Sequence, residues 1–376
     1  MKHRPSYQLL TFYKFVDIDN PREQVKHHLA FCQDIGIKWR IYISEEGISA
    51  TLTCNQGQLA AYQHFLHQNP YFDDLDDQIT SKAMKVSGHK FEKLIVRYRK
   101  EIVALWAPIS QTSFEQSKQS ISHEDLKTII DHKQEDRAIL DMRNSYEYKL
   151  WHFKWAIPAG TINFREVEDL LADYKDKFAD KKVLMYCTWG IRCDKLSVLL
   201  KEKGIDNFYA LDGGVVEYVN NNNDGNRLGN LYTFDGVIST KVGDADTHTT
   251  IGECIYSGYK TNNPENCRYS PCNARILARK KLYKRHGGFC SQACYHHALQ
   301  DGLVKVESFD PLDYKTLRGQ VKQGKLSQEE FLTQVREHLE TFVIDKDYRH
   351  TESQNESLID REYLSQWFAQ EHIHSS

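Results

Sequence analysis

The segment from Lys182 to Leu200 places the tightest limit on the fold. An apolar run, KVLMYC, stops at Cys187, a short loop follows, and helical periodicity begins in DKLSVLLKEKG. A short apolar run with turn signals after it is typical of a strand in a parallel sheet that helices cover on both faces. Binding loops of such sheets lie at the carboxyl ends of the strands, and Cys187 falls at one.

Further strands and helices alternate around this segment. The runs AILDMR and NFYAL, at 138–143 and 207–211, are predicted strands, and VEDLLADYKDKF at 167–178 is a predicted helix. A capping box, SHED, opens another helix near Ser122. This alternation predicts an α/β domain with a doubly wound parallel sheet over residues 122–225.

Residues 1–107 predict a different architecture. Strand-like runs occur at 9–16, on either side of Glu45-Glu46-Gly47, and in KLIVRYRKEIVAL at 93–105, while helices are predicted after Pro21 and within 57–68. The resulting order of strand, helix, strand, strand, helix, strand is that of a ferredoxin-like (acylphosphatase-like) α+β sandwich. Residues 226–376 form a third region, which carries a cysteine cluster and a polar helical tail with an SQEE capping box.

The composition narrows the class of protein. A net charge of −3 over 376 residues does not suggest a polyanion binder from the totals alone. No segment reaches the roughly 18 apolar residues of a membrane span, and the N-terminus lacks the apolar core of a signal peptide. We therefore expect a cytoplasmic protein, in which the nine cysteines are thiols, catalytic groups or metal ligands rather than disulfides. The oligomeric state is not given by the sequence.

The loop after Cys187 has the residue types that stabilise a thiolate. A strand-to-helix junction aims main-chain N–H groups and a positive helix end at the sulfur, Gly190 lets the chain curl around it, and Arg192 adds a fixed positive charge. We predict that Cys187 is a catalytic nucleophile, with a buried structural cysteine as the alternative. The anion and substrate loop is formed by Thr188, Trp189, Gly190, Ile191 and Arg192. Cys193 is either a resolving thiol or a small core residue.

Three segments resemble the signature of rhodanese-fold proteins. They are YCTWGIRC at the loop, DMRNSYEYKLWHF at 141–153 and LDGGVVEYV at 211–219. The resemblance implies that four residues support the fold and the loop: Asp141, Arg143, Glu147 and His152. Trp151 stands where glycine is usual. Phosphatases of this fold have a loop one residue longer, so the four residues between Cys187 and Arg192 favour a pocket sized for sulfur.

The flanking segments RIYISEEGISATLT, FEKLIVRYRKEIVAL and GGFCSQAC extend the match. Together with the loop they are similar to the rhodanese-type tRNA uridine hydroxylases. The resemblance implies that molecular oxygen is used to hydroxylate carbon 5 of the uridine at the tRNA wobble position, in the anticodon loop, with Cys187 matching the essential cysteine. The alternatives are a sulfurtransferase that forms a cysteine persulfide from a small donor, and a non-catalytic tRNA-binding scaffold.

The residues point to sulfur chemistry for this reaction. The sequence shows neither a dinucleotide fingerprint for flavin or nicotinamide nor a set of two histidines and a carboxylate for iron. Two active species are therefore considered: a Cys187 thiolate that adds to carbon 6 of the uracil, and a Cys187 persulfide. Trp189 either stacks on the extruded base or packs against the neighbouring domain.

Five cysteines gather in the third region. They are Cys254, Cys267, Cys272, Cys290 and Cys294, with 12, 4, 17 and 3 intervening residues. Two of these spacings suit a structural zinc site. Ser257, however, stands where a first C-x-x-C pair would close. The sequence therefore favours a metal-free segment, with bound zinc as the alternative.

A basic stretch overlaps this cluster. Residues 267–300 hold seven lysines and arginines and no acidic residue. Such a run suits phosphate contacts along RNA, and a solvated helix face is the alternative. The candidate RNA contacts are Arg279, Lys280, Lys281, Lys284 and Arg285, and the predicted strand around Arg97 and Arg99 could extend this surface.

Overall fold

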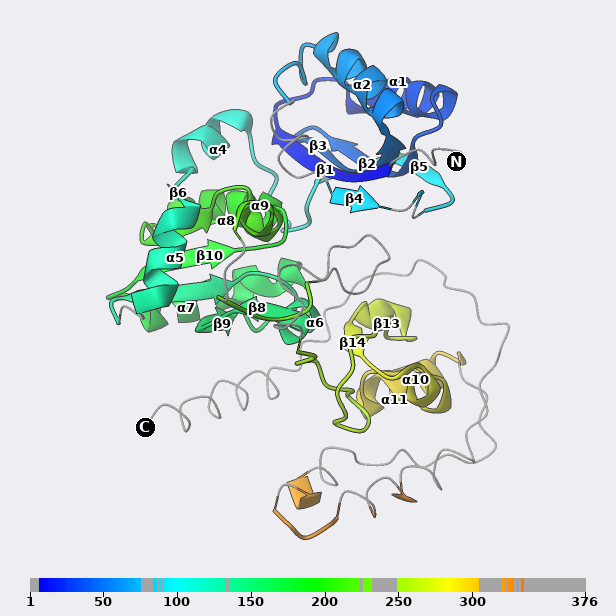
Figure 1. Ribbon diagram of the computed structural model, residues 1–376, viewed down its shortest axis with the longest axis vertical. Helices are drawn as coiled ribbons and strands as arrows, with labels where there is room; N and C mark the ends of the chain where they lie inside the picture. Colours follow the sequence, from blue (N-terminus) through cyan, green and yellow to red (C-terminus); the bar gives the residue numbers. More distant parts are fainter. Residues whose placement is uncertain are drawn as a thin grey trace, which may run out of the picture. The chain divides into compact units, whose positions relative to one another are not determined.

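The computed structural model describes most of the first 303 residues. The described ranges are 7–75, 84–86, 88–89, 91–132, 135–222, 226–231 and 249–303, with short stretches between 319 and 334. They divide into two compact units, residues 1–148 with 152–248, and 149–151 with 249–376 (Figure 1). The predicted tail helix after residue 330 lies largely outside the described residues, but Ser327 and Glu330 exchange the two bonds of the predicted capping box. No helix in the described ranges is long and apolar enough to cross a membrane.

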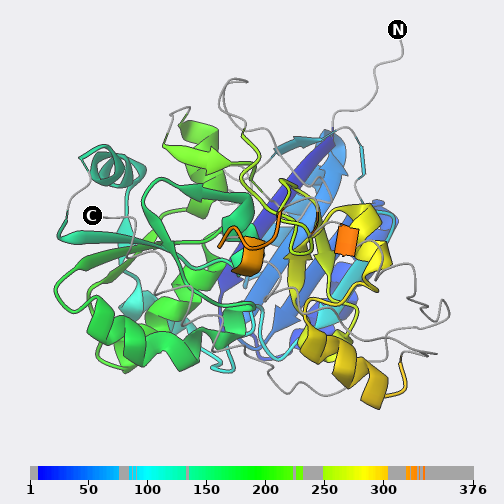
Figure 2. The same cartoon turned by 90° about the horizontal axis from the view of Figure 1, so that it is seen from below.

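The first unit opens with a five-stranded sheet in the order β4-β1-β3-β2-β5. Its strands are β1 (Tyr7–Phe15), β2 (Lys38–Ser44), β3 (Gly47–Asn55), β4 (Met84–Val86) and β5 (Leu94–Tyr98). All neighbours are antiparallel except β2 and β5, which run parallel. Strands β1, β2 and β3 lie side by side in blue in Figure 2. Two helices, α1 (Pro21–Asp34) and α2 (Gln56–His67), cover one face of the sheet (Figure 1).

This arrangement confirms the ferredoxin-like prediction with one difference. The strand that closes the motif beside β1 is β4, whereas the strand predicted within residues 93–105 is β5, at the opposite edge. With three residues, β4 is too short to show a periodicity in the sequence. The core under the helices is formed by alternate strand residues such as Leu10 and Phe12, packed with Cys32, Tyr62 and Leu66.

A second sheet in the first unit has the order β6-β11-β10-β7-β9 and is wholly parallel. Its strands are β6 (Ser120–Ile121), β7 (Arg137–Asp141), β9 (Ala156–Pro158), β10 (Lys182–Tyr186) and β11 (Phe208–Leu211). The elements between them are α5 (His123–His132), α6 (Ser145–Leu150), η1 (Phe164–Leu170), α7 (Leu171–Lys177), α8 (Ile191–Glu202) and α9 (Gly214–Asn221). The short α4 (Gln111–Ser117) precedes this sheet, and β8 (Trp151–Phe153) pairs with β12 (Arg227–Gly229).

Both faces of this sheet are buried, as the apolar run in β10 predicts. Val183 and Met185 pack into a cluster that includes Leu196 of α8, and the alternate residues Leu184 and Tyr186 are each 1% exposed on the other face. The doubly wound parallel sheet is therefore confirmed. The boundaries 1–107, 122–225 and 226–376 stay predictions.

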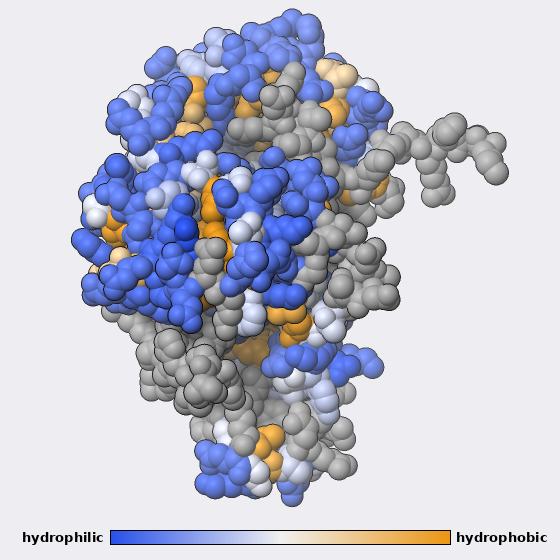
Figure 3. Space-filling view, turned by 60° about the vertical axis from the view of Figure 1, so that its left-hand side comes forward, coloured by the Kyte–Doolittle hydropathy of each residue, from blue (hydrophilic) through white to orange (hydrophobic). Residues whose placement is uncertain are grey.

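The described part of the second unit is small and rich in turns. It contains β13 (Pro264–Asn266), η3 (Ser270–Cys272), β14 (Arg275–Leu277), α10 (Lys280–Arg285) and α11 (Gln292–Gln300). Strands β13 and β14 form an antiparallel hairpin. One face of the molecule, in Figure 3, is mainly hydrophilic with scattered hydrophobic patches. Large exposed hydrophobic side chains among the described residues include Trp106 and Trp155.

Candidate active site

The loop between β10 and α8 wraps its main chain around the sulfur of Cys187. The N–H of Gly190 donates a hydrogen bond to Sγ at 3.1 Å, and Gly190 holds a φ of 96°, which side chains disfavour. From the other side, the first turn of α9 binds the loop, because the N–H groups of Val215 and Val216 donate to the carbonyls of Cys187 and Thr188. We call residues Cys187 to Cys193 the thiolate nest.

The nest shifts the acidity of its thiol strongly. Burial alone would raise the pKa of Cys187, because it disfavours the charged form. A hydrogen bond from the Cys193 side chain, the charge of Arg192 and the N–H groups of both residues outweigh burial and lower the pKa of Cys187 to about 5. Burial and the bond to Cys187 raise the pKa of Cys193 well above its usual value. Cys187 is thus a thiolate at neutral pH, and Cys193 is its protonated hydrogen-bond donor.

The sulfur is also closed off from solvent. Cys187 is 1% exposed and Trp189 is 6% exposed, so the indole does not stand out as a stacking platform in this conformation. Ile191 begins α8 and is half-buried. A nucleobase can reach Sγ only if side chains of the nest move aside.

Arg192 is held by a carboxylate instead of pointing into open space. Its guanidinium donates to both oxygens of Glu147, at 2.7 and 2.9 Å, and to the hydroxyl of Thr188 at 3.1 Å. Thr188 in turn donates to Glu147. Because these groups are buried, the bidentate pair fixes the loop while Arg192 still contributes its charge to the thiolate.

The other residues of the signature form a second buried set. Arg143 donates to both oxygens of Asp141, and the hydroxyl of Tyr186 donates to the same carboxylate at 2.7 Å. His152 lies 2.9 Å from the carbonyl of Tyr148 and stacks on its ring. Trp151 has no positive φ, so the structure places no strain where glycine was expected.

Tyr13 of β1, which the sequence did not single out, lies against the nest. Its hydroxyl donates to Asp194 at 2.7 Å, in the first turn of α8. A Cβ added to Gly190 would lie 2.6 Å from this hydroxyl. The contact links residues 181 positions apart, so no local pattern could have revealed it.

A buried ionic network holds the same helix. Lys195, wholly buried in α8, donates to both oxygens of Glu46 at 2.9 and 2.8 Å, to Glu101 at 2.6 Å and to the carbonyl of Val103. Glu46, at the β2–β3 turn, also accepts from the N–H of Ile102. The sequence indicated Glu46 only as a turn residue.

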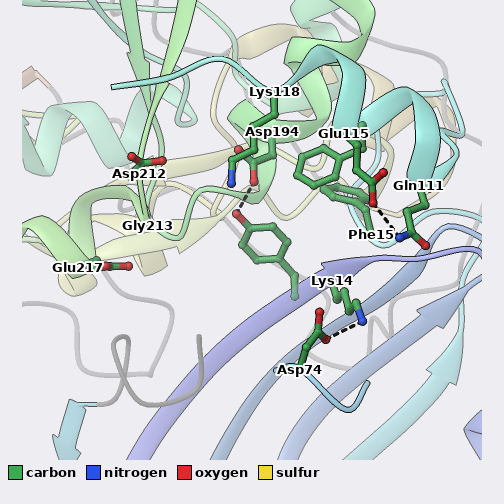
Figure 4. Close-up of a pocket in the computed structure, with 12 residues that line it drawn as sticks. Lys14, Phe15, Asp74, Gln111, Glu115, Lys118, Asp194, Asp212, Gly213 and Glu217 are labelled. Carbon is green, nitrogen blue, oxygen red and sulfur yellow. Dashed lines mark hydrogen bonds and ion pairs between the residues drawn. The ribbon is translucent and has the colours of Figure 1, made fainter. Parts of the chain in front are cut away.

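A pocket of about 330 Å³ adjoins the nest (Figure 4). Its lining includes five carboxylates and two lysines: Asp74, Glu115, Asp194, Asp212, Glu217, Lys14 and Lys118. Lys14 is paired with Asp74 at 2.6 Å. The excess of carboxylates disfavours a phosphate group in this pocket.

The low pKa of Cys187 predicts a thiolate absorbance that appears as the pH rises through about 5 and is missing in Cys187→Ser. Since the folded pKa lies below the ordinary 9.0, the thiolate's contribution to stability is full above pH 9 and is lost as the pH falls through about 5. Difference spectra of the two proteins measure the midpoint. A midpoint near pH 9 would contradict the proposed nest.

Replacing Gly190 with alanine is expected to raise the pKa of Cys187. The variant forces a side chain into a φ of 96° and against Tyr13, at a cost of at least about 1–2 kcal/mol, and displaces the N–H donor to Sγ. The matched control is Gly204→Ala, at a φ of 68° with no atom within 4 Å of the new Cβ. The control carries only the positive-φ cost of about 1–2 kcal/mol, so in denaturant titrations it should lose less stability than Gly190→Ala, and it should keep the Cys187 midpoint.

Comparison with known proteins covers almost all of the described residues. Family models match the chain as a UPF0176 acylphosphatase like domain over residues 7–102, a Rhodanese-like domain over 122–221 and a Rhodanase C-terminal domain over 228–295. A tRNA uridine(34) hydroxylase of Bacillus licheniformis is 34% identical over 293 residues, which is 77% of this chain and 89% of that protein. One of Staphylococcus aureus is 34% identical over 78% of this chain and 90% of that protein. The chain belongs to the tRNA uridine(34) hydroxylase family.

Membership in the tRNA uridine(34) hydroxylase family agrees with the resemblance drawn from the loop and the flanking segments. The match confirms the acylphosphatase-like and rhodanese-like parts of the predicted fold. It does not test which residues act. The roles of Cys187, of its nest and of Cys193 stay predictions.

The third-region candidates divide into two sets. Four of the five cysteines lie together, and Cys254 lies apart, buried in a cluster with Tyr256, Ile276 and Ala278. The basic candidates follow β14: Arg279 precedes α10, and Lys280, Lys281 and Lys284 are exposed on it. The side chain of Arg285 lies outside the described residues.

Proposed function

We infer that the protein hydroxylates uridine 34 of tRNA. The observation that carries this inference is family membership over most of the chain, through relatives named for that activity. A stand-alone sulfurtransferase would explain the rhodanese-like domain but neither flanking domain, and a non-catalytic scaffold would not need an ionised buried thiol. The hydroxylase is therefore favoured over both alternatives.

Cys187 is the group that activates the base in this proposal. Its thiolate adds to carbon 6 of the uracil, which makes carbon 5 enolate-like and able to react with molecular oxygen. The low pKa of Cys187 supports this role, because only a thiolate attacks. A persulfide on the same sulfur is the competing species, and the nest would stabilise that anion too.

Cys193 completes the electron balance. One atom of oxygen enters the product and the other must be reduced to water, which requires two electrons. Once Cys187 is bonded to carbon 6, its negative charge no longer raises the pKa of Cys193. The sulfur of Cys193 then gives up its proton to the departing oxygen, reduces the carbon 5 hydroperoxide to the alcohol and becomes a sulfenic acid. Loss of the proton from carbon 5 then expels Cys187, which attacks the sulfenic acid and releases water. The pair ends as a disulfide, and a cellular thiol restores it.

Substrate binding in this proposal uses an anticodon loop, whose bases can be unstacked at low cost. Two described surfaces carry suitable side chains. On the N-terminal sheet, the guanidiniums of Arg40 and Arg99 each lie 5.0 Å from the ring centre of Tyr42. On the second unit, Arg279 lies over Tyr259 beside the exposed lysines of α10. Both combine cations for phosphates with aromatic faces for bases.

The test uses cells that lack the protein. Nucleoside mass spectrometry of their tRNA should show that 5-hydroxyuridine is lost, and an intact copy should restore it. Growth under labelled molecular oxygen should place one heavy oxygen atom in the restored nucleoside. Unchanged 5-hydroxyuridine in the deletion strain, when no second enzyme replaces it, would refute the function, and an unlabelled hydroxyl would refute the use of oxygen.

A further inference from the structure

Four thiols of the second unit meet around one point. The Sγ atoms of Cys267, Cys272, Cys290 and Cys294 all lie within 4.8 Å of one another. The sulfur of Cys290 is 3.5 Å from that of Cys272 and 3.5 Å from that of Cys294. Four sulfurs at a zinc–sulfur distance of about 2.3 Å form a tetrahedron with edges of about 3.8 Å. The observed spread is that of four ligands around a single ion.

Two segments of the chain, which we call the two arms of the cluster, supply these thiols. Cys267 follows β13 and Cys272 ends η3, whereas the other two come from the start of α11 and the residues before it. The arms are joined by a hydrogen bond from the N–H of Arg268 to the carbonyl of Gly288, at 2.8 Å. The N–H of Cys290 points at the sulfur of Cys267 at 3.4 Å, a bond that stabilises a thiolate ligand.

Other uses of four close thiols fit less well. Two disulfides could pair the four thiols, but all four are free and the sulfur of Cys290 lies 3.5 Å from each of two others, so the geometry singles out no pair. A four-iron cluster needs its thiolates further apart, because the cube lies between them. Cysteines that serve as small hydrophobes belong in a core. Cys254 does so, whereas Cys272 is only half-buried, and Cys290 is half-buried at the edge of the same cluster with its sulfur 3.5 Å from two other sulfurs.

The second unit also needs a source of stability. Among its described residues in the range 249–303, twelve hydrophobic side chains are buried, of which three are cysteines and three are alanines, whereas the single cluster under the N-terminal sheet has seventeen members. Modules with so little apolar burial usually rely on a metal or on disulfides. Charge supports a metal here, because four thiolates and one Zn²⁺ leave a net charge of −2 among the seven lysines and arginines of residues 267–300.

We propose that Cys267, Cys272, Cys290 and Cys294 bind one structural zinc ion. The expectation of a metal-free segment rested on Ser257, which stands where a C-x-x-C pair with Cys254 would close. Neither residue belongs to the four-thiol cluster. The missing cysteine therefore removes no ligand from this site.

Metal analysis of the purified full chain tests the proposal. About one zinc ion per chain is expected, and Cys272→Ser should lower that content severalfold. The matched control is Cys254→Ser, a buried cysteine of the same unit outside the cluster, which should keep its zinc. A zinc-free wild type purified under reducing conditions, or one that holds iron instead, would overturn the proposal.

Cobalt substitution reports the ligands and geometry of the metal site without any change to the sequence. Exchange of the bound ion for Co²⁺ in the intact chain should produce thiolate-to-cobalt charge-transfer bands and the visible bands of a tetrahedral sulfur site. Removal of the ion by a chelator should increase protease cleavage within residues 249–303. An octahedral cobalt spectrum, or four thiols that react freely with a thiol reagent before chelation, would contradict a zinc site.

Discussion

Replacement of Cys187 by serine is expected to abolish formation of 5-hydroxyuridine, with turnover falling by at least about a thousandfold. A serine hydroxyl in the same nest stays protonated at neutral pH and does not add to carbon 6 of the base. The shape of the loop changes little, because Glu147 still holds Arg192 and the first turn of α9 still binds the carbonyls of positions 187 and 188. The measurement is nucleoside mass spectrometry after reaction of purified protein with unmodified tRNA under oxygen.

The control for this result is Cys193→Ser, which keeps the nucleophile but removes the thiol that reduces the hydroperoxide. We expect turnover of this variant to slow and to depend on added thiol, whereas the wild type without added thiol should hold a disulfide between Cys187 and Cys193 after a single turnover. Filter binding of tRNA should be equal in both variants and the wild type. Full activity of Cys187→Ser with intact binding would refute the nucleophile.

The parts of the site that could be predicted consist of residues that are adjacent in the sequence. The loop from Cys187 to Arg192 combines a strand end, a glycine at positive φ and a helix start, and each leaves a local signal. The parallel sheet was predictable for the same reason, since burial on both faces requires an unbroken apolar strand. These local sequence signals were therefore sufficient to predict where the sulfur of Cys187 lies in the fold.

Contacts between distant segments could not be predicted in this way. The loop predicted the positive charge of Arg192, but not that Glu147, 45 positions away, holds its guanidinium. The five cysteines gave spacings that suit zinc, yet spacing cannot show that Cys254 stands apart from the others. No local pattern predicted that Lys195 is buried, yet in α8 every residue from 192 to 200 except Asp194 is buried. Such facts follow only from the assembled fold.

Replacement of Lys195 by methionine is expected to destabilise the first unit by roughly 3–5 kcal/mol. The variant leaves the carboxylates of Glu46 and Glu101 buried without the ammonium that both contact. Chemical denaturation of the full chain measures the loss. Because α8 also carries the nest, a fall in hydroxylation is expected alongside it.

Lys201→Met is the matched control. Lys201 lies on the same helix but is half-exposed and paired with exposed Asp206, so the substitution should change stability by less than about 0.5 kcal/mol.

The pH dependence of the stability loss in Lys195→Met separates lost charge pairing from lost packing. Burial raises the pKa of Glu46, and Lys195 opposes that rise. Without the lysine the pKa of Glu46 rises further. The deficit of Lys195→Met should therefore be small in acid, where Glu46 is neutral, should grow between the wild-type pKa of Glu46 and its higher pKa in the variant, and should be constant above that. A deficit that is equal at every pH would mean that the side chain matters only for its volume.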